Sequence, residues 1–102
     1  MMRFHEDMYV SPSVKNIDKV KRKLRTGSGS LKIYVFVLNH ESKKLEFFHN
    51  SMLKQKVLHK MDMDVVGLAN SQGECMWLTE LMVNDAFEDT GEYDVYKYFM
   101  QE

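Results

Sequence analysis

The sequence predicts a single α/β domain in which helices cover a mixed four-stranded sheet, with the elements in the order α-β-β-α-β-α-β. Three observations predict this class. Two short apolar runs, at 31–38 and 64–69, have the length and the β-branched or aromatic composition of strands. Apolar residues at helical spacing lie before and after these runs. The chain has 102 residues, which is enough for one domain, 1–102, with one modest core.

The N-terminal part is expected to form an arm followed by a helix. Residues 1–10 contain apolar side chains without a sustained period, which indicates an arm that docks on the domain. A serine and a proline at 11–12 are typical of a helix start, and the apolar spacing beyond them predicts a helix over 13–25. The glycines and serines of 26–30 then predict a flexible connector.

The central part predicts a hairpin. Residues 31–38 are apolar at both alternating sets of positions, which is typical of a strand in the middle of a sheet. Residues 39–43 have the composition of a hairpin loop, so 45–49 are expected to return as an antiparallel strand. Residues 51–60 are interpreted as a short helix capped by Ser51, and a bulged loop remains the alternative.

The strongest local signal is the capping-box pattern over 71–74, where a serine and a glutamate satisfy each other's backbone donors. It follows the predicted strand at 64–69 and opens a long helix that ends near Gly91. Residues 93–99 are predicted to form the last strand, joined through right-handed crossovers. The predicted core line of the long helix comprises Cys75, Leu78, Met82 and Ala86.

Charge is divided unevenly along the chain, although the net charge is only −1. Residues 1–60 carry 13 Lys or Arg against 5 Asp or Glu, whereas residues 61–102 carry 1 against 10. Opposite patches on identical chains attract each other. The sequence therefore favours an interaction or regulatory module that self-associates, above all as a homodimer, or that binds another protein.

Several function classes are disfavoured by composition. One cysteine, Cys75, allows neither an internal disulfide nor a cysteine-based zinc site, and its place on the core line favours a buried thiol over a nucleophile. Four histidines show no metal-ligand spacing and no catalytic motif is present, so we expect no metal, no cofactor and no enzyme. No apolar run approaches a membrane span and no secretory segment opens the chain, which predicts a cytoplasmic protein without membrane contact.

Two further surfaces are candidates for binding. The helix over 13–25 has dense positive charge that suits the phosphates of a nucleic acid, and the alternative is a solvated face whose late lysines favour its own dipole. The start of the long helix, at Ser71 and Gly73, is a candidate small-ligand or enzyme site, although the capping box uses some of its donors. The candidate nucleic-acid or anion contacts are Lys15, Lys19, Arg22, Lys23 and Arg25, joined by Lys54 and Lys56.

The long helix carries more apolar residues than one sheet face covers. Trp77 projects away from the core line, and Met76 and Phe87 lie beside that line. We expect these three residues at a subunit interface, with the N-terminal arm as the alternative cover.

The segments SMLKQKVLHK and DVVGLANS resemble parts of a family of short bacterial proteins of about this length, for which no activity is known. The resemblance covers the central and C-terminal parts of the chain. It implies a compact bacterial α/β domain, and it carries over no functional residue.

Overall fold

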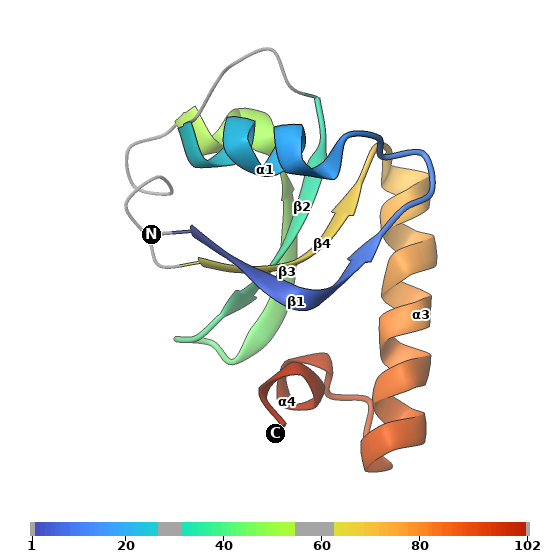
Figure 1. The fold of residues 1–102 in the computed structure, drawn as a ribbon. Coiled ribbons are helices and arrows are strands. Elements are labelled where there is room, and N and C mark those ends of the chain that lie inside the picture. The colour runs from blue at the N-terminus through green and yellow to red at the C-terminus, as the bar shows by residue number, and fades with distance from the viewer. Residues whose placement is uncertain (1, 27–31, 55–62, 102) are drawn as a thin grey trace.

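A four-stranded mixed sheet organises the fold, with its strands in the order β1-β4-β2-β3 (Figure 1). The computed structural model describes residues 2–26, 32–54 and 63–101. β1 pairs parallel with β4, and β2 pairs antiparallel with both β4 and β3. The predicted mixed four-stranded sheet and the predicted hairpin are therefore confirmed. The strands are β1 (Met2–Val10), β2 (Tyr34–Asn39), β3 (Lys44–His49) and β4 (Met63–Ala69).

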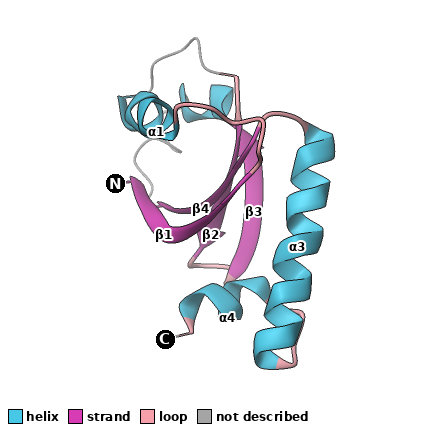
Figure 2. Ribbon diagram, turned by 45° about the vertical axis from the view of Figure 1, so that its right-hand side comes forward, coloured by secondary structure: helices cyan, strands magenta, loops and turns pink. Residues whose placement is uncertain are grey.

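Helices cover both faces of this sheet, with α1 on one side and α3 and α4 on the other (Figure 2). Val20 and Leu24 of α1 belong to one buried cluster, together with Val35 of β2. Met82 of α3 belongs to the second cluster, together with Phe36 of β2. Both faces of β2 are buried, as its sequence predicts. The helices are α1 (Ile17–Thr26), the 3-10 helix η1 (Asn50–Lys54), α3 (Gln72–Thr90) and α4 (Val95–Met100).

The prediction of an N-terminal arm over 1–10 is wrong, because this segment contains β1. Met2, Phe4, Met8 and Val10 pack on the side of α1, so the two-residue alternation of a strand is present. Glu6 interrupts it where the pairing with β4 shifts register, between Phe4 and Tyr9. Because of this irregularity, the sequence of β1 shows no continuous two-residue period.

The predicted last strand over 93–99 is also wrong, because its residues lead into and form α4. Asp94 caps this helix, and its carboxylate accepts a hydrogen bond from the backbone N–H of Lys97 at 3.1 Å. Val95 and Phe99, four residues apart, are the buried pair on one side of the helix. A short β-branched and aromatic run fits a strand or a helix, and the aspartate cap distinguishes them.

The start of the first helix differs from the prediction, and two other predictions fall partly outside the described residues. Asn16 has a left-handed φ of 51°, which a right-handed helix does not continue, so α1 begins at Ile17 and not near 13. In the segment 51–60, residues up to Lys54 belong to η1 and the remainder lies outside the described residues. The connector predicted over 26–30 lies almost entirely outside them as well.

The predicted start and end of α3 are confirmed, and the capping box forms in part, because Glu74 accepts from the backbone N–H of Asn70 and not from that of Ser71. Ser71 Oγ accepts a hydrogen bond from Glu74 N at 3.2 Å, and Glu74 Oε1 accepts one from Asn70 N at 2.8 Å. Gly91 ends the helix with a left-handed φ of 78°, and its N–H donates to Phe87 O. The predicted core line of Cys75, Leu78, Met82 and Ala86 is buried.

Candidate functional site

The basic surface of α1 is exposed on one face of the molecule. Lys15, Lys19, Arg22 and Arg25 are exposed and Lys23 is half-buried. Lys15 donates to the carbonyl of Pro12, while the guanidinium of Arg25 lies 4.8 Å from the centroid of the Phe4 ring. Among the described residues, Lys19 and Arg22 have no acidic partner. Lys56 and the side chain of Lys54 lie outside the described residues, so the second basic group stays a prediction.

Acidic residues are concentrated on α3, which together with α4 lies on the other face of the sheet from α1 (Figure 2). The sequence of α3 contains no Lys or Arg. Lys97 of α4 is paired with Glu92 at 2.7 Å, so its charge is locally neutralised. The division of charge along the sequence thus becomes a division between the two faces of the sheet. The acidic residues of α3 are Glu74, Glu80, Asp85, Glu88 and Asp89.

The predicted interface residues are exposed on α3. Met76 is 69% exposed and Phe87 is 44% exposed. At about 100° per residue these two side chains lie on the same side of the helix, whereas Trp77 lies about 100° away from Met76. Tyr93 is 64% exposed and stacks on Phe87, with ring centroids 4.5 Å apart. With Val83 between them, these residues form one row, which we name the α3 stripe: Met76, Val83, Phe87 and Tyr93.

A cleft of about 420 Å³ lies between β1 and the C-terminal ends of α3 and α4. Asp7 and Asp89 supply negative charge to its lining, and Tyr98 and Phe99 supply aromatic surface. Beside it, the hydroxyl of Tyr9 hydrogen bonds to the Asp85 carboxylate and lies 3.2 Å from the hydroxyl of Tyr98. Burial, and then the hydrogen bond to Asp85, raise the pKa of Tyr9, which keeps this phenol neutral. Carboxylates combined with aromatic surface suit a cationic side chain.

At the predicted ligand site, the side chain of Ser71 makes a hydrogen bond within the protein, whereas ligand binding at Gly73 stays a prediction. The Ser71 side chain caps the helix, and the hydroxyl of Ser13 donates to Glu74 Oε2 at 2.6 Å. The side-chain Nδ2 of Asn70 donates to the backbone carbonyl of Ser13 at 2.9 Å, which fixes the loop before α1 against this junction. The hydrogen bond from Ser13, followed by that from Asn70, lowers the pKa of Glu74. The junction therefore serves as a structural cap.

Cys75 directly follows this junction and is fully buried in the core. Burial raises the pKa of its thiol, and the nearby charge of Glu74 acts in the same direction. A reactive cysteine requires the opposite shift, because the thiolate is the nucleophile. The predicted buried position of Cys75 is confirmed.

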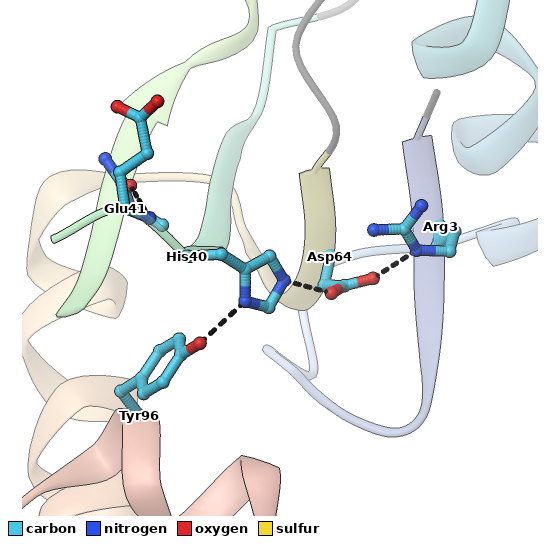
Figure 3. Close-up of polar contacts among 6 residues, drawn as sticks. Arg3, His40, Glu41, Asp64 and Tyr96 are labelled. Atoms are coloured by element: carbon cyan, nitrogen blue, oxygen red, sulfur yellow. Dashed lines mark hydrogen bonds and ion pairs between the residues drawn. The ribbon is translucent and has the colours of Figure 1, made fainter. Parts of the chain in front are cut away.

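A series of polar side chains links β1, β4, the turn between β2 and β3, and α4 (Figure 3). Arg3 Nε of β1 donates to Asp64 Oδ1 of β4 at 2.7 Å. His40 Nε2, in the turn between β2 and β3, lies 2.5 Å from Asp64 Oδ2. His40 Nδ1 lies 2.7 Å from the hydroxyl of Tyr96 in α4. We name Asp64, His40 and Tyr96 the polar triad.

The hydrogen bonds around Asp64 favour the charged form of its carboxylate. Although partial burial opposes ionisation, the hydrogen bonds from Arg3 and His40 lower the pKa of Asp64. The polar triad has no signal in the sequence, because His40 lies 24 residues from Asp64 and 56 residues from Tyr96. No spacing rule relates residues so far apart, and the segment with Tyr96 was interpreted as a strand.

Comparison of the chain with protein-family models, curated proteins and solved structures found no match. The resemblance to a bacterial family therefore stays a prediction. Over the described ranges, no helix has both the length and the apolar character that crossing a membrane requires. Within the same ranges, no three His, Cys, Asp or Glu side chains converge in a way that would hold a metal ion.

Proposed function

We propose that the protein is an association module whose acidic and aromatic α3 surface binds the basic α1 surface of a second copy. The observation that carries this proposal is the α3 stripe, an apolar row within an acidic surface in which Met76, Phe87 and Tyr93 are exposed and Val83 is half-buried. Single exposed apolar residues are ordinary in soluble proteins, whereas contiguous ones mark interaction surfaces. Met76 and Phe87 are about 16 Å apart along the helix axis, so the row extends over much of α3.

Charge determines which kind of partner this surface favours. Glu80 and Glu88 flank the α3 stripe, so pairing two copies of α3 would bring like charges together. A basic surface with some apolar area avoids this repulsion. The outer side of α1 supplies the positive charge through exposed Lys19 and Arg22. Ile17, 37% exposed at the start of the helix, adds apolar area on another side of α1.

The positions of the two surfaces favour a head-to-tail arrangement. The clusters under α1 and α3 lie on opposite faces of the sheet, so one copy presents its basic surface to one neighbour and its acidic surface to another. A two-fold dimer would require both surfaces at a single interface, whereas heterologous contacts form rings or open chains. The proposal therefore replaces the expected two-fold homodimer with a concentration-dependent assembly.

The mass of the protein in solution, measured by light scattering at low and high salt, tests this proposal. We expect a mass above the 12.1 kDa of one chain at low salt, falling as salt screens the charges. Phe87→Glu should abolish the increase, while Phe47→Glu, at an exposed aromatic residue on β3 outside the α3 stripe, should preserve it. A single-chain mass at low salt over the full concentration range would contradict the proposal.

A charge exchange identifies the two surfaces independently. Lys19→Glu with Arg22→Glu reverses two exposed positive charges on the outer side of α1, and Glu80→Lys with Glu88→Lys reverses two negative charges beside the α3 stripe. Each double variant alone should remain a single chain, because the reversed side chains then face like charges on the other surface. The mixture of the two variants should associate again. The new acidic residues on α1 of one variant can then pair with the new basic residues on α3 of the other. Failure of the mixture to associate, when wild type does so, would place the contact elsewhere.

Nucleic-acid binding by α1 is a second candidate, favoured by Lys19 and Arg22, which have no acidic partner among the described residues. Fluorescence anisotropy with generic single- and double-stranded probes at two salt concentrations measures it. We expect the Lys19→Gln, Arg22→Gln double variant to make the salt dependence shallower by about 0.9 per removed charge on duplex DNA. Lys97→Gln, on the acidic face, is the matched control. Absence of binding at low salt would contradict this function.

A further inference from the structure

We propose that Tyr96 is a nucleophilic site whose hydroxyl His40 activates for acyl transfer from an activated ester. The polar triad places a carboxylate, an imidazole and a hydroxyl in the order that nucleophilic hydrolases use. This inference is independent of the association proposed above, because it uses the turn between β2 and β3, the start of β4 and α4.

Hydrogen bonding assigns a role to each nitrogen of the His40 ring. An ionised Asp64 accepts hydrogen bonds and cannot donate them, so His40 Nε2 carries the proton that it donates to Oδ2. In the neutral ring, Nδ1 then has a free lone pair, and the hydroxyl of Tyr96 donates to it at 2.7 Å. The lone pair therefore lies where a general base must lie to accept the tyrosine proton.

Arg3 and Asp64 hold this tautomer in place. Arg3 and Asp64 are direct neighbours in the parallel pairing of β1 with β4, and their ion pair keeps the carboxylate charged beside His40. A charged carboxylate also stabilises the imidazolium that forms when His40 takes a proton. Asp64 is thus a positioning residue, supported by two paired strands.

The site is open to solvent, and its environment differs from that of the other tyrosines. The side chain of His40 is 34% exposed, and Tyr96 is half-buried. The hydroxyl of Tyr9, by contrast, donates to Asp85, and the hydroxyl of Tyr98 lies beside that of Tyr9. All five tyrosines lie in the described ranges, and within those ranges only Tyr96 has an imidazole nitrogen at its hydroxyl.

The chemical step is an acyl transfer. The oxygen of Tyr96 attacks the acyl carbon and forms a new C–O bond, while its proton passes to His40 Nδ1. The bond between the acyl carbon and the leaving oxygen then breaks, and the leaving group departs as an alkoxide or phenolate that takes a proton from His40 or from water. The products are an O-acyl tyrosine and an alcohol or phenol, and no oxidant or reductant is needed.

Reaction of the full chain with p-nitrophenyl acetate, followed by peptide mass spectrometry, tests this proposal. General-base assistance contributes about 10²–10⁴-fold, so we expect Tyr96 to be acetylated at least about 100-fold faster than the exposed Tyr93. His40→Gln should lower the rate at Tyr96 by the same factor and leave Tyr93 unchanged. Asp64→Asn should lower it as well. Equal acetylation of Tyr96 and Tyr93 in wild type would overturn the proposal.

The pH dependence in wild type keeps the test decisive even if a variant fails to fold. A tyrosine without a base reacts as its phenolate, so its rate rises about tenfold per pH unit toward a pKa of about 10. A tyrosine assisted by an imidazole reaches a plateau above the range where histidines titrate, about pH 6.5. We expect the plateau at Tyr96 and the continuous rise at Tyr93. Identical profiles would mean that the polar triad only connects structural elements.

Discussion

Replacement of Phe36 by alanine is expected to lower the free energy of unfolding by about 3–5 kcal/mol, a large share of the roughly 5–15 kcal/mol of a typical domain. Phe36 is 0% exposed and lies in the buried cluster between the sheet and α3. Its ring contacts that of Phe47 on β3, with centroids 5.3 Å apart. Removing this ring from the middle strand leaves a cavity that the two rigid layers cannot close.

Phe47→Ala is the matched control for this prediction, because Phe47 is the direct partner of Phe36 in the pairing of β2 with β3. Phe47 is 48% exposed, so its truncation removes less buried surface and leaves no enclosed cavity. Urea unfolding of both variants measures the difference. An equal decrease in the free energy of unfolding for the two variants would show that α3 does not cover the face of β2 that carries Phe36.

Gly67→Ala is expected to destabilise the fold by about 1–3 kcal/mol, although the substitution adds only one carbon. A Cβ at this position in β4 would lie 2.9 Å from Met82 Cε, 2.9 Å from Phe36 Cδ2 and 3.1 Å from the carbonyl oxygen of Tyr9. The Met82 tip can move aside, because its side chain is flexible. The Phe36 ring and the backbone of β1 cannot move without disturbing the core.

Gly73→Ala is the matched control, because it is expected to raise the free energy of unfolding where Gly67→Ala lowers it. The nearest atom to a Cβ at Gly73 is Ser71 Oγ at 3.9 Å, an ordinary contact on the exposed first turn of α3. Alanine there restricts the unfolded chain and is expected to stabilise the protein by about 0.4–1 kcal/mol. Thermal unfolding of the pair should therefore shift the midpoint in opposite directions. A neutral result for Gly67→Ala would mean that β1 does not lie against this glycine.

The sequence predicts those parts of the fold that depend on local signals. The two-sided apolar run at β2 and the capping box at Ser71 identify a central strand and the long helix correctly. β1 was missed because Glu6 and the register shift interrupt its alternation. α4 was mistaken for a strand because a short aromatic run has no period long enough to measure, and only Asp94 indicates the helix.

The candidate surfaces were predictable to different extents. Projection of the helix places Met76 and Phe87 outside the core line, and both are exposed. The polar triad depends on long-range topology. Arg3 lies beside Asp64 only because β1 joins the sheet parallel to β4, and His40 reaches Tyr96 only because α4 packs against the same end of the sheet. Neither relation is visible before the strand order is known.

The parallel pairing of β1 with β4 also sets the order in which contacts can form. The hairpin of β2 and β3 joins residues close in sequence, whereas the ion pair of Arg3 with Asp64 joins residues 61 positions apart. Closing so large a loop costs more chain entropy than forming the hairpin, so β1 is expected to join the sheet after β4 has paired with β2. Until then β4 is an open sheet edge, which is the surface most prone to pairing with another chain.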